Sequence, residues 1–401
     1  MFARTLLTHA LCLVLAAPLL AQERGVRIGL LRQKAVKNVL VMSAKGPCVL
    51  YADGQRIGEL PANDGLRIEV SPGGISARSL AHVFTARRRI EVVPRLAEGG
   101  FRLRAPDLKI PEQNYPGTLE MTAANGALSL VNHVPLEAYT AGVVQSEAGN
   151  HHHVEYYKLQ SVSCRTYALS NQRKHLPEGF ELCDGTHCQV YHGRSRNDSI
   201  LQAVAETRGL VLVDSEIRMI HATFHSNCGG ETVNAEDVWS KSEPYLLATT
   251  DTFCLGAPQS AWEKVLTKGE WLGYLKRKHG FTSTDPESLK AVLEHEPGCR
   301  DLFLGNVRPL IPLKMVREDL KLRSTFFSIH TQGEQVVLRG RGFGHGVGLC
   351  QEGAMRMARA GRTYTEILHH YYTDVHLVDL TTIDFFRDEA PVTGPGGPSG
   401  R

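Results

Sequence analysis

The stretch VPLEAYTAGVVQSE (residues 134–147) marks the point at which the chain changes character. Before it, short segments alternate apolar and polar residues between glycine-rich turns, a pattern that is typical of β-strands. The last of these segments, residues 119–134, leads directly into the stretch. After it, small residues recur at helical spacing over residues 154–173 and predict a closely packed helix. The sequence therefore predicts an α+β fold in which a mixed domain follows an N-terminal β-rich module.

The composition is that of a globular protein. The chain has 401 residues, a formal net charge of +3 and 42% hydrophobic residues. This is enough apolar material to bury a core, and it excludes a disordered, collagen-like or coiled-coil protein. The charge is nearly balanced and contains no long block of Lys or Arg, so no nucleic-acid partner is expected.

The N-terminus has the pattern of a secretory signal. Arg4 precedes an apolar run, residues 6–20, which ends before the charged residues 22–24. Such a run is too short to span a bilayer comfortably and predicts a signal peptide over residues 1–21. We expect an exported protein of the periplasm, cell wall or extracellular space, without a transmembrane segment.

The remaining chain divides by composition. Residues 22–115 form the predicted β-rich module, and residues 116–385 form the mixed domain. Within that domain, residues of about 260–325 are predicted to be a separate helical insertion. Residues 386–401 are rich in Pro and Gly and are predicted to be a disordered tail.

Glu147 is a candidate general acid. It follows an apolar run, and desolvation on that side would raise its pKa and keep it protonated near neutral pH. Arg165 and Tyr167 lie on the next predicted helix. They either orient this acid or contact a sugar, or they form a salt bridge and a packed aromatic contact.

A cluster of Cys and His residues predicts a metal site. Cys183, His187 and Cys188 lie within six residues on a glycine-containing turn, with His175 upstream and His192 downstream. Two thiolates and two imidazoles can bind one tetrahedral Zn²⁺ ion, and a site closed by protein atoms is structural. The alternative in an oxidising compartment is a disulfide.

Two glycine-rich turns bring polar side chains together. His225 and Ser226 belong to the first, residues 224–232, and His345 belongs to the second, residues 340–348. Neither turn is a phosphate-binding loop, because the Gly-Lys-Ser/Thr ending is absent. The cysteines near them leave the pairing open, since Cys228 and Cys254 could form a disulfide, as could Cys299 or Cys350.

Six motifs in one order resemble the SpoIID/LytB family, the stage II sporulation protein D group. They are residues 134–139, 142–147, 164–168, 186–191, 225–230 and 342–354. The resemblance implies a catalytic domain that acts as a peptidoglycan lytic transglycosylase on glycan strands stripped of their stem peptides. Two departures from the usual pattern are the histidines at residues 151–153 and Cys350, which replaces a serine.

The resemblance also assigns roles to single residues. It places Glu147 at the catalytic acid position and Arg165 and Tyr167 in the matching helix motif. It implies zinc ligands other than His192, namely His175, Cys183, His187 and Cys188. It implies substrate contacts in the glycine-rich motifs, namely His225, Ser226, His345 and Gln351.

One carboxyl group suffices for this chemistry. A glycoside hydrolase needs two carboxyl groups, whereas a lytic transglycosylase uses the muramic acid C6 hydroxyl as its internal nucleophile. Glu147 would protonate the leaving oxygen and then accept the C6 hydroxyl proton, which leaves a 1,6-anhydro end. The alternatives are a non-catalytic glycan-binding module or activator of a cell-wall amidase, and a zinc-dependent peptidoglycan hydrolase. For all of these functions, the expected partners are peptidoglycan glycan strands and other cell-wall hydrolases.

Overall fold

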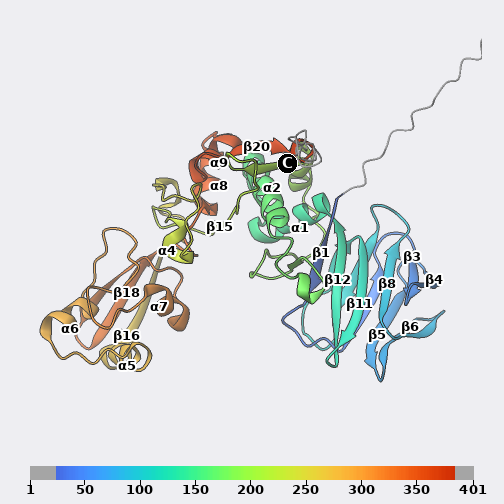
Figure 1. Cartoon of the computed structure of the whole chain (residues 1–401), viewed down its shortest axis with the longest axis horizontal. Helices are drawn as coiled ribbons and strands as arrows, with labels where there is room; N and C mark the ends of the chain where they lie inside the picture. Colours follow the sequence, from blue (N-terminus) through green and yellow to red (C-terminus); the bar gives the residue numbers. More distant parts are fainter. Residues whose placement is uncertain (1–23, 384–401) are drawn as a thin grey trace, which may run out of the picture.

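The computed structural model describes residues 24–383. The predicted signal peptide, residues 1–21, and the predicted tail, residues 386–401, lie outside the described residues. The described chain contains a β-sandwich, a helical region and an insertion, and the sandwich and the insertion lie on opposite sides of the helical region (Figure 1). The α+β fold class is therefore confirmed.

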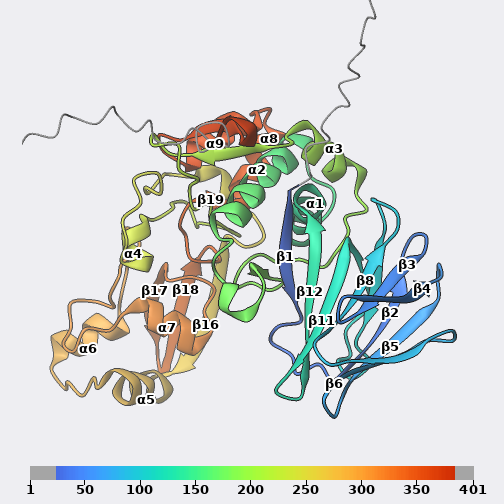
Figure 2. The ribbon, with the colours of Figure 1, turned by 45° about the vertical axis from the view of Figure 1, so that its right-hand side comes forward.

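The N-terminal half forms two sheets that pack face to face (Figure 2). One has the strand order β13-β1-β12-β11-β8-β3-β4, and the other has the order β10-β9-β2-β5-β6-β7. Buried and half-buried side chains alternate along strands such as β2, because successive residues point to opposite faces. The strands are β1 (Gly25–Leu30), β2 (Asn38–Ser43), β3 (Cys48–Ala52), β4 (Gln55–Leu60), β5 (Gly65–Ser71), β6 (Gly74–Arg78), β7 (Val83–Ala86), β8 (Arg89–Pro94), β9 (Gly100–Arg104), β10 (Gln113–Pro116), β11 (Thr118–Ala124), β12 (Ala127–Pro135) and β13 (Leu182–Cys183).

The sandwich extends beyond the predicted boundary at residue 115. Strands β11 and β12 belong to the first sheet, where β12 pairs with β1 and aligns Val134 with Val26. This pairing joins segments far apart in the sequence, so local patterns did not reveal it. Helix α1 (Leu136–Ala148) begins directly after β12, and one continuous core joins the sandwich to the helical region.

The helical region is built around α2 (Val154–Ser170). This helix is buried on nearly all sides, as expected of a helix in the centre of a domain. The elements around it are α1, η1 (Leu176–Glu178), α3 (Asp198–Glu206), β14 (Leu210–Val213), β15 (Phe224–His225), α4 (Ala235–Trp239), η2 (Thr252–Cys254), β19 (Leu349–Cys350), α8 (Gln351–Arg359), α9 (Tyr364–Tyr371) and β20 (His376–Asp379). Strand β15 pairs with β19, which brings the two glycine-rich motifs side by side.

The insertion has its own core and contains a sheet as well as the predicted helices. Its elements are β16 (Ala261–Thr267), α5 (Lys268–His279), α6 (Pro286–Leu293), α7 (Leu313–Leu320), β17 (Phe327–Gln332) and β18 (Gln335–Arg341). The strands form an antiparallel sheet in the order β16-β18-β17, and Trp271 is fully buried against them. The pattern of β16 is weak because Val265 is 46% exposed while Lys264 is half-buried.

None of the helices within residues 24–383 is both long and apolar enough to cross a bilayer.

Candidate active site

The last turn of α1 holds the loop of residues 190–196 through consecutive polar side chains. Gln145 Oε1 accepts a hydrogen bond from Ser195 Oγ at 2.7 Å. Ser146 Oγ accepts one from the backbone N–H of His192 at 3.1 Å. The polar residues at the end of the opening motif therefore fix this loop against the helix.

Glu147 is the next residue and makes a similar contact. Its Oε1 accepts a hydrogen bond from the backbone N–H of Val190 at 2.6 Å. Burial raises the pKa of Glu147, and the bond from Val190 opposes this effect without cancelling it. No cation among the described residues forms an ion pair with this carboxyl group. It therefore holds its proton to a higher pH than an exposed glutamate does, which suits a general acid.

Gly142 allows the loop to approach α1. A Cβ atom at this position would lie 2.1 Å from the carbonyl oxygen of Gly193 and 2.6 Å from the ring of Tyr191. No side chain fits there without moving the loop. The glycine of the motif thus permits the contact between Glu147 and Val190.

Glu147 lies on the wall of a cavity of about 480 Å³. The cavity is lined by α1, α2, the turn before Val190, the segment around β15, α4 and the second glycine-rich turn. Its lining residues are Glu147, Tyr167, Lys174, Thr186, His187, Cys188, Gln189, Thr223, Phe224, Trp239 and His345. Among these described residues, Glu147 is the only carboxyl group.

Tyr167, the second predicted catalytic residue on α2, lines the cavity. Its hydroxyl group accepts a hydrogen bond from Lys174 Nζ at 3.2 Å, and the same ammonium group donates to the carbonyl oxygen of His187 at 2.5 Å. Burial raises the pKa of Tyr167, and the nearby cysteine thiols add to this effect. The phenol therefore stays protonated at neutral pH and can donate a hydrogen bond to a ligand.

Arg165, for which the sequence predicts a catalytic role, does not line the cavity. Its side chain is fully buried, with Nε 2.9 Å from Glu137 Oε1 and Nη2 2.5 Å from Oε2. Nη1 donates to the carbonyl oxygen of Leu210 at 3.0 Å. Glu137 and Glu147 lie at opposite ends of α1, about 15 Å apart along the helix axis. Arg165 therefore links the start of α1 to α2. This contact is the salt bridge that the sequence offered as the alternative to a catalytic role.

His345 is the predicted substrate-binding residue that lines the cavity. Its Nδ1 accepts from the backbone N–H of Val347 at 3.1 Å, so Nε2 carries the proton and donates to the carbonyl oxygen of Phe224 at 3.1 Å. Burial lowers the pKa of His345 to about 4. The ring is neutral at neutral pH and stands 5.2 Å from the Trp239 ring.

The other predicted substrate contacts lie outside the cavity lining. His225 is buried behind His345, with ring centroids 5.3 Å apart, and its Nε2 has no hydrogen-bond partner. Ser226 accepts a backbone hydrogen bond from Glu352 through its carbonyl oxygen at 3.0 Å. Gln351 is 9% exposed and begins α8. These residues support the wall of the cavity instead of forming it.

The four predicted metal ligands converge beside the cavity. Their ligand atoms all lie within 4.8 Å of one another, and they belong to His175, Cys183, His187 and Cys188. His187 Nδ1 is 3.2 Å from His175 Nε2, 3.9 Å from Cys183 Sγ and 3.8 Å from Cys188 Sγ. Tetrahedral Zn²⁺ with ordinary bond lengths would separate such atoms by about 3.3–3.8 Å. The donor set therefore fits zinc, and both cysteines are free thiols.

His175, Cys183, His187 and Cys188 together form the loop cluster, and neighbouring side chains hold it in place. The carboxylate of Glu178 lies 2.6 Å from His175 Nδ1 and is also bound by Arg32 Nε at 2.5 Å. A carboxylate on the far ring nitrogen is the usual support of a metal-binding histidine. His192 is not part of the cluster, and only its backbone contacts Ser146.

Sequence reasoning missed several lining residues. Trp239 is 42% exposed at the end of α4, and Phe224 is the first residue of the first glycine-rich turn. Gln189 and Thr186 flank the predicted metal ligands. An exposed tryptophan near a motif was the one available signal, because aromatic rings commonly bind ligands from such positions.

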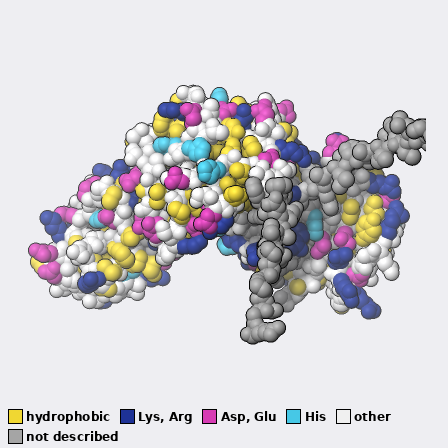
Figure 3. Space-filling model, turned by 45° about the horizontal axis from the view of Figure 1, so that its top comes forward, with side chains coloured by type: hydrophobic (Ala, Val, Ile, Leu, Met, Phe, Trp, Pro, Cys, Tyr) yellow, Lys and Arg dark blue, Asp and Glu magenta, His cyan; other side chains and the backbone are white. Residues whose placement is uncertain are grey.

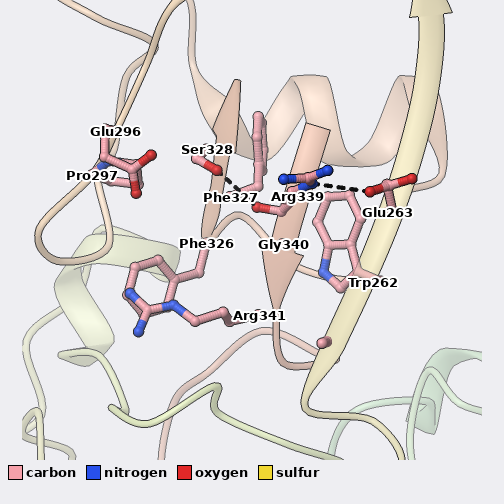
Figure 4. A pocket seen from close by; sticks show the side chains of 11 residues that line it. Trp262, Glu263, Glu296, Pro297, Phe326, Phe327, Ser328, Arg339, Gly340 and Arg341 are labelled. Carbon is pink, nitrogen blue, oxygen red and sulfur yellow. Dashed lines mark hydrogen bonds and ion pairs between the residues drawn. The ribbon is translucent and has the colours of Figure 1, made fainter. Parts of the chain in front are cut away.

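A larger cavity, of about 690 Å³, lies in the insertion away from Glu147 (Figure 4). Trp262 contributes an aromatic ring to it. Glu263 forms an ion pair with Arg339 at 3.0 Å, and the exposed Glu296 lies 3.2 Å from Nε2 of His330. This cavity therefore offers no desolvated acid comparable to Glu147.

Comparison with known proteins identifies the family. The family model described as "Stage II sporulation protein" matches residues 124–213, which contain α1, α2 and the loop cluster. A Stage II sporulation protein D of Bacillus subtilis is 30% identical over 258 residues, covering 60% of this chain and 74% of that protein. The chain belongs to the SpoIID/LytB family.

Other SpoIID/LytB relatives differ in name. An uncharacterized protein of Brachyspira hyodysenteriae is 33% identical over 284 residues, covering 67% of this chain and 74% of that protein. A protein of Bacillus subtilis named Amidase enhancer is 28% identical over 284 residues, covering 58% of this chain and 39% of that protein. The family thus includes proteins named for sporulation and for the enhancement of an amidase.

Proposed function

We propose that this protein is a peptidoglycan lytic transglycosylase with Glu147 as its general acid and base. The observation that carries the proposal is a single desolvated carboxyl group on the wall of a cavity, without a second carboxyl group among the described lining residues. A hydrolase would need a second carboxyl group to activate water or to attack the sugar. The names of the relatives support a role at the cell wall.

Glu147 would act twice in one turnover. The protonated carboxyl group donates its proton to the glycosidic oxygen between MurNAc and GlcNAc as that bond breaks. The carboxylate then accepts the proton of the muramic acid C6 hydroxyl, whose oxygen forms the new bond to C1. The N–H of Val190 supports the carboxylate between these steps. The product is a 1,6-anhydroMurNAc end, and no water is consumed.

The remaining cavity residues suit a sugar chain. Trp239 and Phe224 offer aromatic surface for sugar rings, while Tyr167 offers a hydroxyl group. On the face shown in Figure 3, Lys and Arg side chains are interspersed with Asp and Glu. A glycan strand without stem peptides presents hydroxyl and amide groups and one lactyl carboxylate on each MurNAc. Stacking and hydrogen bonds would bind the sugar rings, and Lys174 in the cavity lining offers a cation for the carboxylate.

The loop cluster would hold a structural Zn²⁺ ion. A zinc ion bound by His175, Cys183, His187 and Cys188 leaves no open position for water. It would order the turn that leads to Val190, and through it the hydrogen bond to Glu147. Removing zinc with a chelator is expected to lower the melting temperature and the turnover together. Loss of turnover at an unchanged melting temperature would instead indicate a catalytic metal.

Peptide-free glycan strands test the proposal. Glu147→Gln preserves the size of the side chain and its hydrogen-bond acceptor but removes the proton donor. We expect it to abolish the release of anhydro-ended fragments while the variant melts no lower than the wild type. Full release by Glu147→Gln would refute the role of Glu147. Gln202→Glu, at an exposed position of the neighbouring helix α3, is the control. It should leave the release of anhydro-ended fragments unchanged.

A second candidate function is the activation of a cell-wall amidase, which the relative named Amidase enhancer favours. An activator would increase the release of stem peptides by an N-acetylmuramoyl-alanine amidase, and Glu147→Gln would leave that increase intact. Measuring stem-peptide release and anhydro ends in the same mixture separates the two functions. Stimulation of the amidase without anhydro ends would favour the activator.

The proposed substrate lies outside the cytoplasm, so we propose that the protein is exported. Residues 1–21 would be removed during export. The N-terminal sequence of the protein recovered from its host should begin at Gln22, and retention of Met1 would contradict this proposal.

A further inference from the structure

A second group of metal-ligand side chains lies beneath the two glycine-rich motifs. Three thiols and one carboxyl group meet there, and their ligand atoms all lie within 4.8 Å of one another. They belong to Cys228, Asp251, Cys254 and Cys350, and all four side chains are fully buried. We propose that this inner cluster binds a structural Zn²⁺ ion through three thiolates and one carboxylate. It is separate from the loop cluster and does not depend on the proposed enzyme activity.

The distances within the inner cluster fit a shared ion. Cys228 Sγ lies 3.3 Å from Cys254 Sγ and 3.3 Å from Asp251 Oδ2. Two sulfur ligands of a tetrahedral Zn²⁺ ion lie about 3.8 Å apart, whereas disulfide sulfurs lie about 2.05 Å apart. The cysteines of the inner cluster are free thiols in the structure. Their spacing is therefore closer to that of a metal-bound pair.

The charge of Asp251 supports a bound cation. Its Oδ2 accepts a hydrogen bond from Tyr371 Oη at 2.9 Å, and its Oδ1 accepts one from the backbone N–H of Cys254 at 3.3 Å. Among the described residues, no Lys, Arg or His forms an ion pair with it. A fully buried carboxylate without a countercharge is costly. A divalent ion would supply a countercharge, and the hydrogen bond from the Tyr371 hydroxyl group would fix the orientation of the Asp251 carboxylate.

The backbone around the sulfurs favours thiolates. The N–H of Cys228 donates to Cys350 Sγ at 3.3 Å. Such a donor stabilises the anionic sulfur that a metal requires. Three thiolates with one carboxylate form a soft, closed donor set that selects Zn²⁺ over Mg²⁺ or Ca²⁺.

Arg300 provides a cation next to the inner cluster. It comes from the insertion, and its Nη2 donates to the carbonyl oxygen of Cys228 at 2.6 Å. Its Nε and Nη1 are buried without hydrogen-bond partners. Zinc with three thiolates and a carboxylate keeps a net negative charge, which Arg300 would offset.

The inner cluster also closes the base of the insertion. The chain enters the insertion after Cys254 and returns from it before Cys350. Cys228 follows His225 by three residues, and Cys350 follows His345 by five. An ion here would fix the two glycine-rich motifs that form and support the wall of the Glu147 cavity. This gives the site a structural purpose independent of the loop cluster.

Metal content of purified variants tests the proposal. The full mature chain, isolated without chelator or reductant, should contain two zinc ions per chain by mass spectrometry of the metals. Cys228→Ser with Cys254→Ser should retain one, and Cys183→Ser with Cys188→Ser should also retain one. Cys299→Ser, an exposed cysteine outside both clusters, is the control and should retain two. If the variant with Cys183→Ser and Cys188→Ser contains no zinc, the proposed site at the inner cluster is wrong.

X-ray absorption spectroscopy tests the inner cluster without changing its residues, so the test does not depend on whether a variant of that cluster folds. The chain carrying Cys183→Ser and Cys188→Ser keeps the inner cluster intact, so its remaining zinc reports on that site alone. We expect three sulfur neighbours at about 2.3 Å and one oxygen neighbour. A zinc surrounded by nitrogen and oxygen alone would contradict the assignment.

A disulfide is the competing state, and thiol alkylation distinguishes it. In this experiment the wild-type protein is denatured without reductant, in the presence of a chelator and an alkylating reagent. The proposal expects Cys228, Cys254 and Cys350 to be alkylated together. A mass showing Cys228 linked to Cys254 in the zinc-containing protein would overturn the proposal.

Discussion

The two ends of α1 carry glutamates in opposite surroundings. Glu137 is bound by the buried guanidinium of Arg165 and by the backbone N–H of Gly209 at 3.3 Å. Glu147 has one backbone donor, no ion pair among the described residues, and a pKa raised by burial. The same side chain is therefore paired with a cation at one end of the helix, and is desolvated without a cation partner among the described residues at the other. The environment assigns the role of each carboxyl group.

Removing the acid should have the largest effect. Glu147→Gln is expected to lower turnover on peptide-free strands by about 10²–10⁴-fold, the usual contribution of general acid catalysis. Turnover by the wild type should also fall as the pH rises through the pKa of Glu147, because the acid form is consumed. A pH–rate profile measured at saturating substrate checks this. A profile without that falling limb would mean that another group is the acid.

Breaking the ion pair should affect stability instead. Arg165→Met leaves Glu137 without its cation, and loss of one partner of a buried pair costs about 3–5 kcal/mol. Chemical denaturation measures this loss, and turnover per folded molecule should stay near that of the wild type. Arg359→Met, at an exposed position of α8, is the matched control. Normal stability with lost turnover would restore a catalytic role to Arg165.

Crowding the contact between α1 and its loop should weaken both properties modestly. Gly142→Ala places a Cβ atom 2.1 Å from the carbonyl oxygen of Gly193, and overpacking of this kind costs about 1–3 kcal/mol. Because the loop carries the Val190 N–H, turnover should also decrease. Gly269→Ala has open space around it and is the control. Equal melting temperatures for the two variants would contradict the described contact.

The smallest effect concerns the stability of Glu147→Gln across pH. Because the pKa of Glu147 is raised in the folded protein, folding favours its protonated form. This advantage is complete below the unfolded pKa of about 4.3 and is lost as the pH rises through the folded pKa. The variant should therefore gain stability relative to the wild type as the pH increases. Melting curves from pH 4 to pH 8 measure the difference, and a constant offset would show that Glu147 is not desolvated.

Local patterns predicted the elements around the site well. The apolar run before Glu147 indicated desolvation, and the spacing of Cys183, His187 and Cys188 indicated a cluster that the structure brings together with His175. Both predictions rest on residues close together in the sequence, so they could be made without knowledge of the tertiary structure. The fold class was predictable for the same reason.

Contacts between distant segments were not predictable. The partner of Arg165 lies on another helix, and the convergence of Cys228, Cys254 and Cys350 requires two loops on either side of the insertion. The first strand of the insertion's sheet, β16, was missed because it exposes Val265. Trp239 entered the cavity through tertiary packing alone.

The ends produced by cleavage in ¹⁸O-labelled water test the central claim most directly. The purified protein is incubated with peptide-free glycan strands, and the fragments are weighed by mass spectrometry. A single acid at Glu147 predicts 1,6-anhydroMurNAc ends that carry no ¹⁸O, formed by the wild type and not by Glu147→Gln. Reducing ends that carry ¹⁸O would show hydrolysis and contradict this account.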